Sequence, residues 1–237
     1  MGAATASQLS SEARNVAIIL DGNARWADSR GLPVAEGHRA GTRAVRRTVE
    51  AAIDLGVRSL ALYAFSTENW SRPVDEVEAL MAIFDETIDR ELPDLAAQGV
   101  RTRFIGRRDR APEELGRKMD QLEGRTAAND RLLLWIAFDY GGRDEILEAA
   151  RRLLADGVPP AAIDEPAFAA RLFAPEMPDP DLLIRTSGER RVSNFLLWQL
   201  AYAELVFVET LWPDFGADEL RGALAEFARR RRRFGGR

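Results

Sequence analysis

The segment DGNARW begins a group of residues suited to holding a phosphate. Asp21 directly follows an apolar run, and Gly22, Asn23 and Arg25 come after it. Glycine allows the backbone to approach a ligand closely, Asn23 can cap a helix whose free N–H groups face an anion, and Arg25 adds a charge-assisted donor. A phosphate or diphosphate suits this set, although a capped helix with a surface aspartate would have the same residues.

The segment STENWSRPVDE places a second polar group between an apolar run and a helical one. Turns favour residues such as Ser71 and Pro73, but turn formation does not explain Glu68, Asn69 and Arg72 beside an aromatic residue. We therefore predict a functional loop. Its candidate residues are Ser66, Thr67, Glu68, Asn69, Trp70, Arg72 and Glu76.

A third polar group, in DLLIRTSGERRVSN, contains Arg185, Arg191 and Ser193 around a Ser-Gly turn. Arginines can hold a second anionic group through bidentate contacts, whereas the alternative is solvated surface charge. Further along, Glu204 lies in a mostly apolar stretch, where an ionised carboxylate needs an ion partner or a bound cation. Asp21 and Glu204, completed by phosphate oxygens and water, predict a Mg²⁺ site.

His38 is the single histidine of the chain and lies close to the first loop, in EGHRAG. With no second His and no Cys, a histidine-rich or thiolate zinc site is excluded. A lone histidine is either a surface or capping residue, or here a phosphate contact or proton relay. We favour the second interpretation because His38 is near the first loop.

Short apolar runs alternate with amphipathic stretches along the chain. The strands and helices that they form must position the polar segments described above. The predicted strands are 16–20, 59–65, 100–106, 132–138 and 181–185, and the predicted helices are 41–55, 74–92, 112–123 and 143–156. This rhythm predicts an α/β fold, a single domain with a mostly parallel central sheet flanked by helices. Because ligands bind beyond the carboxyl ends of such strands, the polar segments should meet at one edge of the sheet.

The helix predicted over 74–92 has one apolar face. Its residues are Val77, Leu80, Met81, Phe84, Ile88 and Leu92. Core packing explains such a face, and the wall of a tunnel for a hydrocarbon chain would have the same pattern.

The composition fits one globular domain. With 237 residues, 46% of them hydrophobic, the chain predicts a flexible tail over 1–15 and a single catalytic domain over 16–237. The net charge of -5 argues against nucleic-acid binding. The lack of Cys, of a signal peptide and of a membrane span predicts a cytoplasmic protein. The run RRRRRF near the end is either solvated or interfacial, which allows peripheral membrane contact.

Together these motifs resemble the cis-prenyltransferase (isoprenyl transferase) family, which includes bacterial undecaprenyl diphosphate synthase. The matching blocks are, in order, DGNARWADSRG, GHRAG, LYAFSTENWSRP, DYGGRDEI, DPDLLIRTSGERRVSNFLLWQLAYAEL, WPDF and RRRRRFGG. The resemblance implies a homodimeric, Mg²⁺-dependent enzyme with a hydrophobic tunnel between the sheet and helices. Such an enzyme condenses isopentenyl diphosphate with an allylic diphosphate and forms Z double bonds.

The resemblance also implies the substrates, the product and the location. The starter would be farnesyl diphosphate, and the product undecaprenyl diphosphate for the lipid carrier of cell-wall peptidoglycan synthesis. The enzyme would be cytoplasmic, in peripheral contact with the inner face of the membrane for product release. A short- or medium-chain Z-prenyl diphosphate synthase, or a non-catalytic subunit of this fold, is the alternative.

Residue roles follow from the same resemblance. Asp21 and Glu204 correspond to the magnesium-related carboxylates, and Asp21, Ser66 and Asn69 to residues near the reacting centre, with the proton acceptor left open among these residues and the diphosphate itself. The allylic diphosphate site corresponds to Gly22, Asn23, Arg25, Trp26 and His38. The isopentenyl diphosphate site corresponds to Arg185, Arg191 and Ser193, and the loop that closes over the substrates to Ser66, Glu68, Asn69, Trp70, Arg72 and Glu76.

The chain departs from the family pattern at three places. Val34 stands where an arginine usually grips the first diphosphate, so Arg30 or Arg39 would have to compensate. The family's NYGG is here DYGG, which puts a negative charge, Asp139, near the expected site. Bulky residues precede this motif, and either one would shorten the tunnel if it pointed inward. These are Trp135 and Phe138.

Two rival enzyme classes fit less well. A phosphohydrolase with a strand-end aspartate nucleophile would need a second aspartate where Asn23 stands. A trans-type prenyltransferase would be all-helical, with aspartate-rich motifs that this chain lacks. A non-catalytic subunit should have lost the Asp, Asn and Arg positions that are present.

Overall fold

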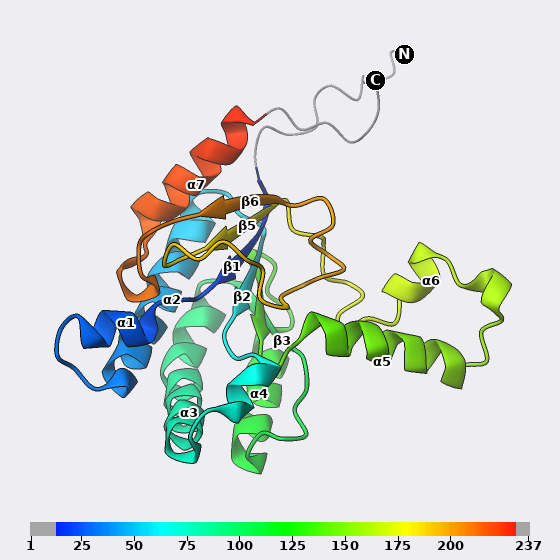
Figure 1. Cartoon of the computed structure of the whole chain (residues 1–237), viewed down its shortest axis with the longest axis horizontal. Coiled ribbons are helices and arrows are strands. Elements are labelled where there is room, and N and C mark those ends of the chain that lie inside the picture. The colour runs from blue at the N-terminus through cyan, green and yellow to red at the C-terminus, as the bar shows by residue number, and fades with distance from the viewer. Residues whose placement is uncertain (1–12, 231–237) are drawn as a thin grey trace.

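Six parallel strands form the central sheet of the protein (Figure 1). The computed structural model describes residues 13–230, except for the side chain of Leu92. The strands are β1 (Asn15–Ile19), β2 (Ser59–Tyr63), β3 (Val100–Ile105), β4 (Leu132–Ala137), β5 (Leu182–Arg185) and β6 (Glu204–Phe207). Their order across the sheet is β3-β4-β2-β1-β5-β6, and all neighbouring pairs are parallel. The predicted α/β fold is confirmed.

The five predicted strands are present, and a sixth was not predicted. Strand β6 is a four-residue edge strand inside the long apolar stretch that contains Glu204, and only Val206 of its residues is buried. Such a short, half-exposed strand has no clear alternation in sequence. Strand β1 begins at Asn15, which pairs with Ser59, so ordered structure starts inside the predicted tail of residues 1–15.

The helices of the described chain comprise the four predicted ones, with shifted ends, and three for which no residue range was predicted. They are α1 (Asn23–Asp28), α2 (Val34–Asp54), α3 (Val74–Ala97), α4 (Glu113–Thr126), α5 (Gly142–Ala155), α6 (Glu165–Ala169) and α7 (Ala217–Arg229), with single 3₁₀ turns at η2 (Thr67–Ser71), η3 (Pro160–Ala162) and η4 (Trp212–Asp214). Helix α2 starts at Val34, seven residues before the predicted start at Gly41, so that Gly37 and His38 lie inside the helix. Helix α3 continues through Pro93, where a helix end was predicted.

The two faces of the sheet bury alternate residues, as expected for a parallel sheet covered on both sides. Val16 and Ile18 of β1 pack in a core with Phe227 of α7 and with residues of α2. Their neighbours Ala17 and Ile19 pack on the opposite face with residues 195 and 196. A third apolar cluster lies between α3, α4 and the ends of β3 and β4. Helices α5 and α6 extend away from the body on the side opposite α7 and α2 (Figure 1).

Two glycines allow α2 to cross α1 at very short distance. A Cβ atom at Gly37 would lie 2.1 Å from the carbonyl oxygen of Asn23, and one at Gly41 would lie 2.5 Å from the Oδ1 atom of Asn23. The indole Nε1 of Trp212 donates to the carbonyl oxygen of Gly41 at 2.9 Å and closes this contact from the side of η4. Helix α1 is therefore fixed directly behind the first polar loop.

Within residues 13–230, no helix is both long and apolar enough to cross a membrane. The tail predicted to be flexible lies mostly outside the described residues, and so does most of the arginine-rich run 229–234.

Candidate active site

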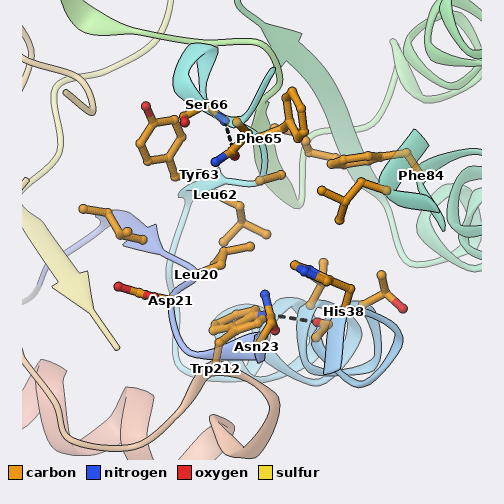
Figure 2. A pocket seen from close by; sticks show the side chains of 18 of the residues that line it. Leu20, Asp21, Asn23, His38, Leu62, Tyr63, Phe65, Ser66, Phe84 and Trp212 are labelled. Atoms are coloured by element: carbon orange, nitrogen blue, oxygen red, sulfur yellow. Dashed lines mark hydrogen bonds between the residues drawn. The ribbon is translucent and has the colours of Figure 1, made fainter. Parts of the chain in front are cut away.

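A pocket of about 590 Å³ opens at the carboxyl ends of the strands, where the polar segments were predicted to meet. Nine of the predicted site residues line it. They are Asp21, Asn23, His38, Ser66, Glu68, Asn69, Arg72, Arg185 and Ser193. Figure 2 shows Asp21 and Ser66 facing this space from two different strand ends, with Phe84 on the far side. The predicted convergence of the polar segments on one edge of the sheet is confirmed.

The apolar part of the pocket comes mainly from α3 and from the strands beneath it. The apolar lining includes Val45, Leu62, Phe65, Leu80, Ile83, Phe84, Ile88, Phe104 and Ile136. The apolar face predicted for residues 74–92 is thus divided, because Leu80, Phe84 and Ile88 line the pocket whereas Met81 belongs to a second pocket. The site joins a polar mouth to an apolar interior, which suits an amphipathic ligand.

The loop after β1 is held by Thr186, which follows β5. The backbone N–H of Asp21 donates to Thr186 Oγ1 at 2.9 Å, and that hydroxyl lies 2.7 Å from the carbonyl oxygen of Asp21. Gly22, with a left-handed φ of 108°, is the residue that caps α1. The prediction that Asn23 caps the helix is therefore wrong: Asn23 is the first helical residue, and its buried Oδ1 has no hydrogen-bond partner in the described chain.

Arg185 lies at the centre of the polar mouth. Its Nη2 donates to Asp21 Oδ2 at 2.7 Å, and its Nη1 donates to Ser193 Oγ and to the carbonyl oxygen of Arg191, each at 2.6 Å. The side chain is only 4% exposed, and its Nε has no partner among the described residues. The first and third polar groups of the sequence, predicted to hold two different anions, therefore share one ion pair.

Arg25 and Arg191 form the outer edge of the mouth. The Nη1 of Arg25 donates to the carbonyl oxygen of Ser187 at 3.1 Å, and its Nη2 lies 3.8 Å from Asp21 and 3.9 Å from Glu189. Arg191 pairs with the same Glu189, and both arginine side chains are more than half exposed. Glu189 therefore gathers two cations beside Asp21 that an incoming anion can recruit.

His38 faces the pocket as a neutral imidazole. Burial lowers its pKa to about 4, with the nearby Arg72 lowering it further and Glu76 opposing this change. Its Nε2 is buried and has no hydrogen-bond partner within the described residues. His38 can thus donate or accept one hydrogen bond to a ligand but does not contribute positive charge at neutral pH.

The lid segment, residues 66–72, forms one wall of the mouth around the 3₁₀ turn η2. The backbone N–H of Ser66 donates to Asn69 Oδ1 at 2.9 Å, which fixes the Asn69 side chain against the start of the segment. Glu68 accepts a hydrogen bond of 2.9 Å from Asn194 Nδ2, and Arg72 donates to Glu76 at 2.7 Å. The lid segment is thus connected to the loop after β5 and to the first turn of α3.

Six predicted substrate-binding residues do not line the pocket, and two of them are tryptophans. The six are Gly22, Arg25, Trp26, Trp70, Glu76 and Arg191. The indole of Trp26 donates to Asp214 Oδ1 at 2.7 Å, and the Arg30 guanidinium lies 4.1 Å from its ring centroid. Trp70 packs edge-on against Phe65, with the ring centroids 5.2 Å apart, and faces the second pocket. In this structure Trp26 secures α1 to η4, and Trp70 secures the lid segment from behind.

The predicted pairing of Glu204 with Asp21 at one metal ion is wrong within a single chain. Glu204 is level with Leu182 and Val16 in the sheet, whereas Asp21 follows the opposite end of β1. The three residue steps from Glu204 to Phe207 alone span roughly 10 Å along the strand. The charge of Glu204 is instead satisfied by Arg230, whose Nη1 donates to it at 2.8 Å.

The residues present still fit a magnesium ion brought by a diphosphate. The Asp21 carboxylate is 31% exposed and turns toward the pocket. No group of three or more acidic or histidine side chains that could hold a metal is found in residues 13–230. Magnesium commonly takes one or two protein carboxylates and completes its shell with phosphate oxygens and water, so Asp21 is the residue that would hold it.

The departures from the family pattern have specific structural outcomes. Val34 begins α2 and is exposed. The two arginines proposed to bind the first diphosphate in place of the family's arginine form contacts elsewhere. Arg30 bonds Asp214 at 3.2 Å, and Arg39 pairs with Glu36 at 3.6 Å and Glu86 at 3.7 Å. Neither arginine lines the pocket, so the predicted compensation is absent in this arrangement.

The three residues at the other two departures lie outside the pocket lining. Trp135 faces the opposite side of the sheet, where its Nε1 donates to Ser59 Oγ at 3.1 Å. Phe138 lies behind the lining and stacks on Phe65 with ring centroids 5.6 Å apart. Asp139 is fully buried and paired with Arg110, so its charge is neutralised rather than presented to the site.

Sequence reasoning missed four polar residues of the site. They are Thr186, Ser187, Glu189 and Asn194. Thr186 directly follows a predicted strand, a position that could have identified it. Ser187 was assigned to a Ser-Gly turn, and Glu189 follows that turn without a pattern that marks it. Asn194 has a left-handed φ of 63°, which only the folded loop reveals.

Comparison with known proteins agrees with this geometry. The model of the undecaprenyl diphosphate synthase family (Prenyltransf) matches residues 19–235. Isoprenyl transferase 2 of Bradyrhizobium diazoefficiens is 52% identical over 226 residues, covering 94% of this chain and 90% of that protein. The farnesyl-diphosphate-specific ditrans,polycis-undecaprenyl-diphosphate synthase of Xanthomonas axonopodis pv. citri is also 52% identical, with 94% and 88% covered.

A solved structure shows the same fold. The crystal structure of lavandulyl diphosphate synthase from Lavandula x intermedia, in complex with dimethylallyl diphosphate, superimposes with a TM-score of 0.92 at 39% identity. The match covers 95% of this chain and 99% of that structure. The chain belongs to the undecaprenyl diphosphate synthase family of cis-prenyltransferases.

Proposed function

We propose that this cis-prenyltransferase uses Mg²⁺ to extend farnesyl diphosphate with isopentenyl diphosphate and so makes undecaprenyl diphosphate. The observation that carries the proposal is the joining of the Asp21–Arg185 pair at the polar mouth to an apolar interior walled by α3. A diphosphate fits the first part and a prenyl chain the second. The name of the Xanthomonas relative, a farnesyl-diphosphate-specific undecaprenyl diphosphate synthase, supports both the starter and the product.

The chemistry requires a departing diphosphate and an attacking alkene. The C1–O bond of the allylic diphosphate breaks, the diphosphate leaves with the electron pair, and C1 bonds to C4 of isopentenyl diphosphate. Loss of a proton from C2 then creates the new double bond. Arg25, at 3.8 Å from Asp21, stabilises the charge that develops on the leaving group. A magnesium ion bound at Asp21 would neutralise further negative charge on the same diphosphate.

A second diphosphate must be held so that the reacting carbons are close together. Arg185 and Ser193 are the residues we propose for it, with Arg191 recruited from its exposed pairing with Glu189. Ser66 and Asn69 line the same pocket from the lid segment, so they can approach an alkene bound there. These two side chains, Asp21 and the diphosphate oxygens are the groups available to accept the proton.

A shorter Z-prenyl product is the second candidate. The apolar part of the pocket contains the rings of Phe65 and Phe84, and Phe138 packs edge-on against Phe84 at 5.2 Å between centroids. This aromatic group limits the length of chain that the present arrangement accommodates. The likeness to a lavandulyl diphosphate synthase fits a small product equally well.

The assembly we propose is a homodimer in peripheral contact with the inner face of the membrane. Leu147 and Leu154 on α5 are 55% and 76% exposed, on a helix that extends from the body of the protein (Figure 1). A second subunit covering this helix would bury both leucines. Membrane contact rests on the chemistry of the product, a long hydrocarbon that must leave the pocket for a lipid phase.

The direct test is incubation of the purified protein with labelled isopentenyl diphosphate, farnesyl or geranyl diphosphate and Mg²⁺, followed by sizing of the products. We expect label incorporation that a chelator abolishes and excess Mg²⁺ restores. An eleven-isoprene product supports the undecaprenyl assignment, and a ladder that stops early supports the shorter-chain candidate. Absence of incorporation with either starter, under conditions where a related enzyme works, would overturn the proposal.

A further inference from the structure

Asp139 is a buried acid that the pocket does not use. It follows β4, has a left-handed φ of 46° and is 0% exposed. Its carboxylate accepts from Arg110 Nε at 2.9 Å and from Arg110 Nη2, a bidentate contact. Burying a lone carboxylate is costly, so the arginine from the loop between β3 and α4 is what makes an aspartate tolerable here.

The same guanidinium also covers Trp70 of the lid segment. Its central carbon lies 5.1 Å from the centroid of the Trp70 ring, within the range of a cation–π contact. The ring meets Phe65 edge-on at 5.2 Å, and its Nε1 has no hydrogen-bond partner in the described part of the chain. Arg110 therefore bridges the fixed end of β4 and the aromatic side chain of the lid segment.

Open space lies on the outer side of this contact. A second pocket of about 460 Å³ is lined by Trp70, Arg72, Val77, Met81, Arg110 and Pro112, among others. Because the surroundings of the ring are incompletely filled there, Trp70 has room to shift if the guanidinium is lost. The position of the Trp70 ring depends on Arg110 more than it would in a closely packed core.

The near end of the lid segment is tied to the residue after Asp139. The N–H of Thr67 donates to the carbonyl oxygen of Tyr140 at 3.0 Å, and Ser66 and Tyr140 form an isolated parallel β-bridge. One dipeptide, 139–140, thus fixes the lid segment twice, through its backbone at Ser66 and Thr67 and through the guanidinium at Trp70. Ser66 lies at the first attachment, and Asn69 lies between the two.

We propose that Arg110 and Asp139 form a positioning pair that holds the lid segment so that Ser66 and Asn69 point into the pocket. Neither residue of the pair lines that pocket, so both act through Trp70 and not by touching substrate. The inference rests on the proposed function for its kinetic consequence. It goes beyond that function in naming what sets the geometry of the lid segment.

The test uses three variants of the full chain and one control. Asp139→Asn keeps a residue that tolerates a left-handed φ, Arg110→Gln removes the cation, and the double variant removes both charges without leaving either one buried alone. The control is Arg107→Gln in the same loop. Arg107 pairs with Asp109 at 2.7 Å and lies 3.8 Å from Asp144, so its side chain supports neither Trp70 nor the pocket.

The expected kinetic result is a fall in kcat with little change in the KM for the allylic diphosphate, because the Asp21 loop stays intact. We expect about a tenfold loss of kcat for each single variant, in keeping with the cost of a small misplacement of reacting groups. The double variant should lose no more than the worse single variant, since the pair acts as one unit. Arg107→Gln should retain wild-type kinetics.

Hydrogen–deuterium exchange without substrate supplies a readout that a purely structural role would not give. Faster exchange in a peptide covering residues 66–72 is expected for Arg110→Gln and the double variant, with exchange in α4 unchanged. Lower thermal stability with unchanged exchange at 66–72 and unchanged kcat would overturn the proposal. If the wild-type protein transfers no prenyl group, the proposed function fails, yet the exchange experiment still decides whether the pair holds the lid segment.

Discussion

The Arg185 guanidinium donates a hydrogen bond of 2.7 Å to the Asp21 carboxylate and so joins the ends of β5 and β1. Arg185 is almost fully buried, so its charge depends on this carboxylate and on the oxygen atoms of Ser193 and Arg191. A bound diphosphate would offer Arg185 further acceptors, and Asp21 would then be able to share its oxygens with a cation. The ion pair is therefore a resting arrangement that substrate binding would reorganise.

Replacing Asp21 by alanine should abolish prenyl transfer while leaving the fold intact. The variant loses the carboxylate that would hold magnesium beside the leaving diphosphate, and we expect kcat to fall at least about 100-fold. Arg185 keeps two oxygen acceptors, so the unfolding free energy should drop by only about 1–3 kcal/mol. Steady-state kinetics and chemical denaturation measure the two effects.

The matched control for Asp21 is Asp28→Ala on the exposed side of α1. It removes one carboxylate from the same helix region without touching the pocket, and its kinetics should equal those of the wild type. Near-normal activity of Asp21→Ala would remove Asp21 from its proposed role.

Replacing Arg185 by lysine should raise the KM for isopentenyl diphosphate more than it lowers kcat. Lysine keeps the positive charge but cannot reach Asp21, Ser193 and the Arg191 carbonyl oxygen at once. Loss of one charged hydrogen bond corresponds to about a 10- to 100-fold rise in KM. Arg190→Lys, at an exposed neighbouring position, is the control, and an unchanged KM for Arg185→Lys would contradict the assignment.

The buried His38 should make the protein less stable in mild acid. Its folded-state pKa of about 4 lies below the ordinary histidine value of 6.5, so between these values the unfolded chain binds more protons. The unfolding free energy should therefore be constant above pH 6.5 and should fall by about 2–3 kcal/mol on acidification to about pH 4.5. Urea denaturation of the wild type and of His38→Asn at both pH values isolates this contribution, since the asparagine variant should lose that part of the pH dependence.

Shortening Phe84 should lengthen the products. Phe84 contributes its ring to the pocket lining, and its removal joins the space it fills to the existing cavity. In Phe84→Ala we expect a product distribution displaced toward longer chains, together with about 3 kcal/mol lower stability. Met81→Ala changes the same helix on the side of the second pocket and should leave chain length unaltered. Equal product lengths in both variants would argue that another residue closes the pocket.

Much of the fold could be predicted because the strands and helices are marked by the pattern of apolar residues within each short segment. Runs such as VAIIL are apolar throughout, as expected of a strand buried on both faces, and five of the six strands follow from this pattern. Strand β6 could not be predicted, because three of its four residues are only partly buried and its sequence merges with the apolar stretch before it. The start of α2 could not be predicted from local propensity, because Gly37 lies inside the helix, where its close contact with Asn23 of α1 requires a glycine.

Individual site residues could be predicted from the polar segments that contain them. Contacts between residues that are far apart in the sequence could not. Asp21 and Arg185 were both identified, but their direct contact spans 164 positions and no local pattern encodes it. For the same reason the ion pair of Glu204 with Arg230, 26 positions away, was not predicted. Asp139 was taken as a free charge near the site because Arg110 belongs to a separate loop.

The crossing of α1 and α2 makes two positions intolerant for reasons unrelated to reactivity. No side chain fits at Gly37, where even a methyl carbon would lie 2.1 Å from the Asn23 carbonyl oxygen, and Gly41 has similarly little room. In a saturation mutagenesis screen both positions would score as essential, although glycine has no functional group to offer a substrate. The absence of a side chain at both glycines thus sets the spacing between the two helix backbones, and with it the position of α1, which begins two residues after Asp21.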